Sequence, residues 1–123
     1  MTPASNGMRV VDIHAHYYPE TYLELFNTEG RRFDTDFRRS EQGFFFKTPI
    51  QSGGPLPDRF IDLAQRLADM DRQGVTVQAL SLTGPMVNWG DAELSHHLAT
   101  AWNDGAAAAH RASDRAGSGS GLR

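Results

Sequence analysis

The segment DRFIDLAQRLADMDRQGVTVQALSL, residues 58–82, carries the clearest fold signal in the sequence. Apolar residues recur at helical spacing up to Gln73, and Asp58 is placed to cap the amino terminus of that helix. Gly74 suits the position just after a helix, and the β-rich run at residues 75–82 follows it at once. The segment therefore predicts a helix, a tight turn and a strand, which is the order found in α/β proteins.

Upstream of this segment the sequence predicts one strand and one short helix. Residues 9–16, RVVDIHAH, alternate with a period of two, as a strand does. Pro19 can start a helix over residues 20–26. Residues 27–57 then lose the pattern and include the Gly/Pro-rich stretch SGGPLP, so we expect a long excursion with room for one hairpin.

Downstream, the sequence predicts a second helix and then no regular structure. Asp91 can cap that helix, so strand and helix alternate as in a parallel sheet with covering helices. The chain closes with ASDRAGSGSGLR, which is rich in Gly and Ser. We expect one partial domain over residues 1–112 and a disordered tail over residues 113–123.

Composition excludes several classes of function. The chain has 123 residues, which allows one domain. Fifteen acidic against 12 basic residues, a net charge of −3, leave no basic footprint for nucleic acid. The absence of Cys excludes a disulfide scaffold, a thiolate metal site and a Cys nucleophile, so any metal must bind His, Asp or Glu. No apolar run approaches the roughly 18 residues of a membrane span and no signal peptide is evident, so we expect a cytoplasmic protein without membrane contact.

His14 and His16 stand two residues apart at the carboxyl end of the predicted first strand. The strand period puts both imidazoles on one face, with Asp12 below them. Such a pair can hold one divalent metal, although a catalytic zinc site adds a third protein ligand and an open position for water. Catalytic groups of α/β barrels come from this end of the strands. His14 and His16 are therefore candidate metal ligands; ordinary surface or capping histidines are the alternative. Asp12 either orients a ligand or is satisfied by neighbouring backbone.

The motif VDIHAH at residues 11–16, together with MDRQGVTVQALS at residues 70–81, resembles the amidohydrolase-related family, most closely its aminocarboxymuconate-semialdehyde decarboxylase-like branch. The similarity runs from residue 9 to about residue 115 and is strongest over residues 58–81. Members are metal-dependent (β/α)8 barrels, called TIM barrels, in which the H-x-H of the first strand holds the metal. The resemblance implies that His14 and His16 bind a divalent cation, with zinc as the first choice.

The resemblance also implies site residues that this sequence does not supply. In the family, a His from a middle strand and an Asp from the last strand complete the site. A TIM barrel takes about 250 residues, whereas this chain offers two strand and helix units plus an excursion. We therefore expect the N-terminal part of a barrel. Because the match decays into AGSGSGLR, truncation or a frameshift of the coding sequence is our hypothesis.

Other residues with chemical potential have plainer interpretations. His96, His97 and His110 fall on the predicted second helix, which packs outside the sheet in this architecture, so we expect structural roles. Trp89 either borders a pocket or covers the core. Basic and acidic residues interleave in the excursion, which indicates a solvated hairpin, with Lys47 or Arg39 holding a substrate carboxylate as the alternative. The residues concerned are Arg31, Arg32, Arg38, Arg39, Lys47, Asp34, Asp36 and Glu41.

The sequence thus favours a metal-dependent hydrolase or non-oxidative decarboxylase, acting on a small carboxylic acid or amide, of which this chain is a part with little or no turnover of its own. The alternative is a catalytically silent fragment that pairs with another copy or a complementary chain through an open apolar edge at residues 75–82. A free-standing small metal-binding module is a third possibility, for which ligands beyond two are missing.

Overall fold

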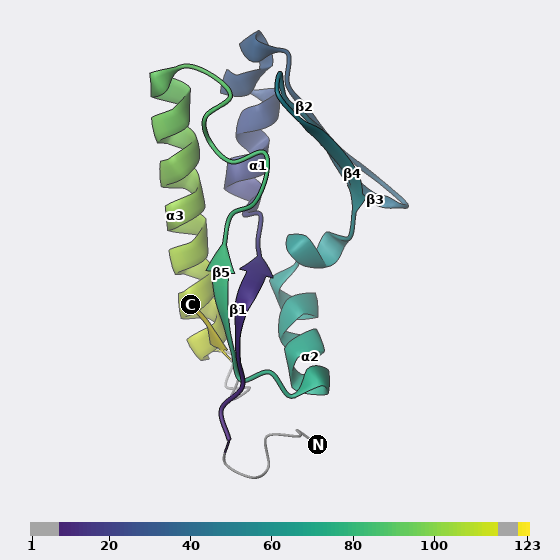
Figure 1. Cartoon of the computed structure of the whole chain (residues 1–123), viewed down its shortest axis with the longest axis vertical. Helices are drawn as coiled ribbons and strands as arrows, with labels where there is room; N and C mark the ends of the chain where they lie inside the picture. The colour runs from purple at the N-terminus through teal and green to yellow at the C-terminus, as the bar shows by residue number, and fades with distance from the viewer. Residues whose placement is uncertain (1–7, 116–120) are drawn as a thin grey trace.

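The computed structural model describes residues 8–115 and 121–123 and shows a mixed α/β protein (Figure 1). Within these residues a parallel sheet and an antiparallel sheet are accompanied by three α-helices and two short 3-10 helices. In chain order the elements are β1 (Val11–His16), α1 (Glu20–Asn27), η2 (Glu29–Phe33), β2 (Asp36–Ser40), β3 (Gly43–Lys47), β4 (Ser52–Leu56), η3 (Asp58–Phe60), α2 (Leu63–Gln73), β5 (Val77–Ser81), α3 (Ala92–Arg115) and β6 (Gly121–Leu122).

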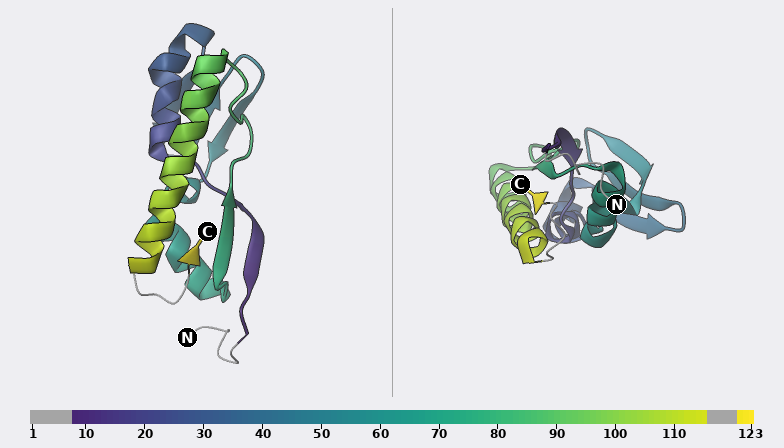
Figure 2. Two further views of the ribbon diagram at one scale, coloured as in Figure 1. Left: turned by 90° about the vertical axis from the view of Figure 1, so that its left-hand side faces the viewer. Right: turned by 90° about the horizontal axis from the view of Figure 1, so that it is seen from below.

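The parallel sheet has the strand order β1-β5-β6. β5 pairs in parallel with β1 on one side and with β6 on the other. Figure 2 shows α2 and α3 on the same side of the β1 and β5 strands. The α/β class with a parallel sheet and covering helices is confirmed, and the three strands of the described residues form an open sheet rather than a closed barrel.

The predicted edge for self-association is wrong, because β5 lies inside the sheet. Val77 pairs with Val11 of β1 and with Gly121 of β6, so both sides of β5 are used at that point. β1 and β6 are the outer strands of this sheet, and β1 exposes Val11 by 51% and Ile13 by 81%, whereas Leu122 of β6 is buried. The open apolar strand of this sheet is therefore the first one.

α2 begins later than the sequence predicts. Asp58 starts the 3-10 helix η3, and the cap of α2 is Asp62, whose side chain accepts the Gln65 N–H at 3.1 Å. Both aspartates fit the pattern of an N-cap, but only Asp62 stands three residues before a free helical N–H group. The predicted end is confirmed, because Gly74 adopts the left-handed conformation that ends α2.

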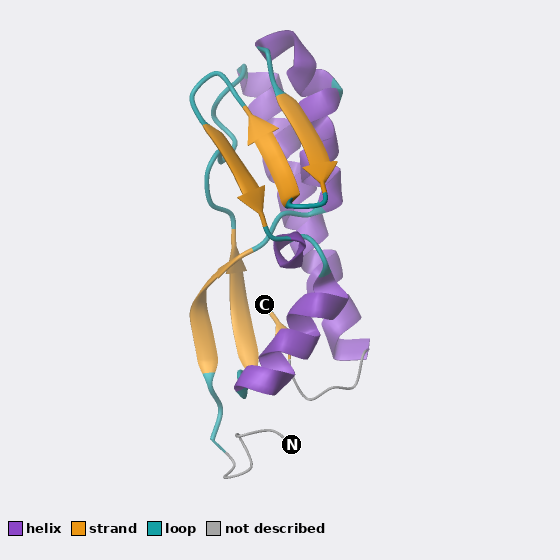
Figure 3. Cartoon of the chain, turned by 90° about the vertical axis from the view of Figure 1, so that its right-hand side faces the viewer, coloured by secondary structure: helices purple, strands orange, loops and turns teal. Residues whose placement is uncertain are grey.

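The excursion contains an antiparallel sheet of order β2-β3-β4, one strand more than the predicted hairpin. Phe44 and Phe46 of β3 lie on one face of the strand and are buried in the core, as a period of two dictates, while the two edges of β3 pair with β2 and β4. In Figure 3 this sheet stands beyond the carboxyl ends of β1 and β5. It therefore stands near the end of the parallel strands where the His pair lies.

Two hydrophobic clusters hold the chain together. The larger, which we call the aromatic cluster, joins α1, β3 and the start of α3, and its buried members are Tyr18, Tyr22, Leu23, Phe26, Phe44, Phe46, Ile61, Trp89, Leu94 and Leu98. The smaller, which we call the sheet cluster, lies against the parallel strands, and its buried members are Tyr17, Met70, Ala109 and Leu122. The predicted helix α1 is present. The predicted cap of α3 is also present, because Asp91 accepts the Leu94 N–H at 2.9 Å.

The disorder expected for residues 113–123 is wrong for the described residues of that segment. α3 continues to Arg115, and the buried Ser113 hydroxyl accepts the Leu122 N–H at 3.0 Å. Leu122 itself is fully buried and pairs with Gln78 of β5. The burial of Leu122 thus places Gly121 and Leu122 in the parallel sheet, although composition alone indicates no strand there. Residues 116–120 lie outside the described residues.

Candidate functional site

The two candidate ligands lie side by side at the end of β1. The ring centroids of His14 and His16 are 4.7 Å apart with an interplanar angle of 82°, and their Nε2 atoms are 2.9 Å apart. His14 is exposed and His16 is half-buried. The predicted juxtaposition of the two imidazoles is therefore present, with the same nitrogen of each ring turned toward the other.

The strand that carries the pair is irregular between Asp12 and Ala15, where its register with β5 shifts. The His14 N–H donates to Asp12 Oδ1 at 2.9 Å, and Asp12 Oδ2 accepts from Gln78 Nε2 at 3.4 Å. Of the two roles predicted for Asp12, the structure supports the one in which its carboxylate is satisfied by a neighbouring backbone N–H group. Its carboxylate makes no hydrogen bond to an imidazole within the described part of the chain.

Ser81 contacts the His pair from the neighbouring strand. His16 Nδ1 lies 3.2 Å from Ser81 Oγ, and the Tyr17 N–H donates to the Ser81 carbonyl at 3.1 Å. The contact follows from the parallel register, which places Ser81 opposite His16. The two strands thus fix both the backbone and the ring of His16.

Arg66 connects α2 to the back of the strand that carries the His pair. Its Nη1 donates to Gln78 Oε1 at 2.9 Å, and its Nη2 donates to the carbonyls of His16 at 2.5 Å and Arg59 at 3.4 Å. These three acceptors belong to β5, β1 and η3. One guanidinium therefore joins α2 to three other elements around the site.

This guanidinium is buried without a direct ion pair among the described residues. Arg66 is 7% exposed, and its Nε has no hydrogen-bond partner there. Burial lowers the pKa of Arg66, while the nearby Tyr17, Asp12 and Asp69 act in the opposite direction. Arginine stays protonated in proteins, so a positive charge sits behind the His16 carbonyl, held mainly by neutral acceptors.

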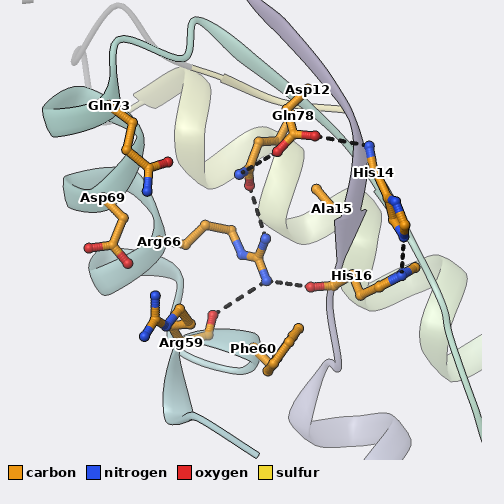
Figure 4. A pocket seen from close by; sticks show the side chains of 10 residues that line it. All are labelled: Asp12, His14, Ala15, His16, Arg59, Phe60, Arg66, Asp69, Gln73 and Gln78. Carbon is orange, nitrogen blue, oxygen red and sulfur yellow. Dashed lines mark hydrogen bonds between the residues drawn. The ribbon is translucent and has the colours of Figure 1, made fainter.

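A cavity of about 350 Å³ lies between β1 and α2 (Figure 4). In Figure 4 the two imidazoles lie on one side of the β1 ribbon, and Arg66 and Asp69 lie on the other. The volume falls within the range of small-molecule sites, roughly 300 to 1,000 Å³. The lining residues are Asp12, His14, Ala15, His16, Arg59, Phe60, Arg66, Asp69, Gln73 and Gln78.

A third metal ligand is not in place. Among residues 8–115 and 121–123, no group of three or more His, Cys, Asp or Glu side chains can hold a metal ion. His97 Nδ1 is 2.6 Å from Glu29 Oε2, and His110 Nδ1 is 2.8 Å from the Leu122 carbonyl. With His96, they lie on α3, away from the pair, in agreement with the structural roles predicted for them. The glutamate raises the pKa of His97.

Three of the cations of the excursion are occupied by carboxylates. Arg32 pairs with Asp91 at 2.8 Å, Arg39 with Glu20 at 2.6 Å and Lys47 with Asp34 at 3.0 Å. The Arg38 guanidinium instead lies over the Phe45 ring at 4.4 Å. These are the exposed pairs of a solvated sheet, as predicted, and Arg39 and Lys47 already have carboxylate partners.

Trp89 belongs to the core rather than to the cavity. It is 5% exposed and its ring centroid lies 5.0 Å from that of Phe26. Of the two interpretations left open by the sequence, the structure supports the one in which this side chain covers the core.

Sequence reasoning missed Arg66, Gln78 and Ser81. Arg66 is three residues after Leu63 and four before Met70, so it falls on the buried face of α2. Gln78 interrupts an apolar run, and a polar residue in such a place needs a partner. Ser81 ends the strand that pairs with β1. A charged or polar residue on a predicted apolar face was the available signal.

Comparison with known proteins adds no assignment. No family model matches the chain, and no curated protein matches it significantly. Among the helices of the described residues, none combines the length and apolar character that a membrane span requires.

Proposed function

We propose that His14 and His16 bind one divalent cation, with zinc as the first choice, as part of the centre of a metal-dependent hydrolase or non-oxidative decarboxylase of the amidohydrolase type. The observation that carries this proposal is the 2.9 Å separation of the two Nε2 atoms. The substrate class proposed is a small carboxylic acid or amide.

The separation of the two nitrogens fits a shared cation. Zinc binds imidazole nitrogen at about 2.0 to 2.1 Å, so two nitrogens on one tetrahedral zinc lie about 3.3 Å apart, and two at a right angle about 2.9 Å apart. The 2.9 Å between the Nε2 atoms is close to both values. The two donor atoms therefore need little movement to share one ion.

The place of the pair in the sheet supports an enzyme site. β1 and β5 are parallel, and His16 and Ser81 lie at their carboxyl ends, the end at which α/β folds bind ligands. The cavity of about 350 Å³ also touches both histidines.

The chain supplies two ligands and the groups that hold them. When bound, a cation of this kind provides Lewis acidity that polarises a carbonyl group and activates water. His14 and His16 would hold it, Ser81 and Arg66 fix the position of His16, and Asp12 fixes the backbone of His14. A catalytic site takes at least three protein ligands, so we expect little or no turnover from these two alone.

Zinc binding by substituted chains tests the proposal. We expect the unaltered chain to bind one zinc ion and His14→Ala to lose at least about tenfold in affinity, since a direct ligand should count for at least as much as the groups that orient one. His96→Ala is the matched control, because His96 is exposed and lies on α3. Metal content after gel filtration and competition with a chromophoric chelator give the stoichiometry and the affinity. Equal zinc binding by His14→Ala and the unaltered chain would contradict the proposal.

A further inference from the structure

The ring of His16 has a partner on each of its two nitrogens. Nε2 faces His14 Nε2 at 2.9 Å, and Nδ1 faces Ser81 Oγ at 3.2 Å. His14 differs, since no hydrogen bond to its Nδ1 is present within the described residues and its side chain is exposed. The two histidines are therefore held unequally, and Ser81 is the difference.

The position of the proton on His16 follows from this arrangement. A neutral imidazole carries one proton, so an Nε2 that offers its lone pair to a cation requires an N–H at Nδ1. In that tautomer the Nδ1–H would donate to Ser81 Oγ, which lies 3.2 Å away. Metal-bound histidines usually donate their second ring nitrogen in this way, and the partner fixes both the tautomer and the ring orientation.

We infer that Ser81 is a positioning residue for the His14 and His16 pair, which holds His16 in its Nδ1–H form with Nε2 directed to the cation. The inference rests on the proposed function. It extends that proposal, because it assigns the neighbouring strand a part in metal binding.

The backbone contacts of this corner do not depend on the serine hydroxyl. The Ser81 carbonyl accepts the Tyr17 N–H at 3.1 Å, and the His16 carbonyl accepts from Arg66 at 2.5 Å. Replacing Ser81 by Ala leaves both contacts possible, so the strand ends stay in place. The variant then removes one hydrogen bond to the ring and little else.

The test compares zinc affinity in three variants. We expect Ser81→Ala to weaken zinc binding by about tenfold to 100-fold, the range seen when the partner of a metal-bound histidine is removed. Ser81→Thr keeps the hydroxyl and should stay within about threefold of the unaltered chain. Ser52→Ala is the matched control, because Ser52 is an exposed strand residue of the other sheet.

Nitrogen-15 NMR of the metal-free protein separates positioning from general stability. The unaltered chain and Ser81→Thr should show His16 as the Nδ1–H tautomer, and Ser81→Ala should show a mixture at an unchanged denaturation midpoint. Unchanged zinc affinity and tautomer in Ser81→Ala would overturn this inference alone. Absence of zinc binding by the unaltered chain would overturn the proposed function and this inference with it.

Discussion

The half of the molecule around the aromatic cluster and the half around the parallel sheet are built differently. The aromatic cluster buries ten side chains, six of which are at most 1% exposed: Tyr22, Leu23, Phe26, Phe44, Leu94 and Leu98. The sheet cluster buries four, and the outer strand β1 leaves Val11 and Ile13 exposed by 51% and 81%. The His pair belongs to the thinly covered half. Apolar burial therefore stabilises one half, whereas polar contacts hold the site in the other.

The polar contacts of the sheet half are concentrated around one guanidinium. Arg66 reaches Gln78 and the carbonyls of His16 and Arg59, and Asp12 supports the His14 N–H. Buried hydrogen bonds are directional, whereas apolar packing is not. Hydrogen bonds therefore fix the positions of two ring nitrogens 2.9 Å apart better than apolar packing does.

The largest loss of stability should come from a substitution in the aromatic cluster. Phe26 is fully buried and its ring centroid lies 5.4 Å from that of Tyr22, so Phe26→Ala should lower the free energy of unfolding by about 3–5 kcal/mol. Ile13→Ala on the exposed strand should change it by less than about 0.5 kcal/mol. Guanidinium denaturation followed by tryptophan fluorescence measures both. If the alanine variant does not fold, Phe26→Leu replaces it. Equal losses in the free energy of unfolding at positions 26 and 13 would contradict the difference between the two halves.

A smaller effect is expected from the polar network. Arg66→Ala leaves the Gln78 amide oxygen and the His16 carbonyl without their donor, and an unsatisfied buried group costs about 1–3 kcal/mol. Arg59→Ala is the control, since Arg59 is exposed and contributes its carbonyl rather than its side chain. Urea denaturation should show a lower free energy of unfolding for Arg66→Ala and an unchanged one for Arg59→Ala. A stability equal to that of the unaltered chain would show that the network does not hold the sheet half.

The smallest effect is a dependence of stability on pH in the aromatic half. The side-chain hydrogen bond between His97 and Glu29 raises the pKa of His97 above 6.5 in the folded state. The contribution of this exposed pair is therefore complete below about pH 6.5 and is lost as the pH rises through the raised value. Denaturation midpoints of the unaltered chain should fall slightly between about pH 5.5 and pH 8.5 relative to those of Glu29→Gln. Parallel pH profiles of the two proteins would contradict this.

The elements with a strong local pattern were predictable from the sequence. The alternation in residues 9–16, the helical spacing before Gln73 and the glycine at position 74 gave β1, α2 and its end. The juxtaposition of the two imidazoles also followed from the strand period, even though the register shifts between Asp12 and Ala15. In α2 the pattern is supported by a buried face, whereas β1 is supported by its pairing with β5, since Val11 and Ile13 are exposed.

Features that depend on distant partners were not predictable. Leu122 is buried because β6 pairs with β5 beside a hydrophobic cluster. Phe44 and Phe46 make a three-stranded sheet because α1 provides the surface on which they pack. Asp62 rather than Asp58 caps α2 because the turn η3 comes first. Tertiary contacts decide the first two of these features, and no short window of sequence contains both partners.

The central claim is that the Nε2 atoms of His14 and His16 share one cation, and a zinc titration followed by nitrogen-15 NMR of the imidazoles tests it most directly. We expect the Nε2 resonances of His14 and His16 to change together and to saturate at one equivalent, while those of His96, His97 and His110 stay in place. A titration in which the pair does not respond, or in which the histidines of α3 respond instead, would contradict the claim.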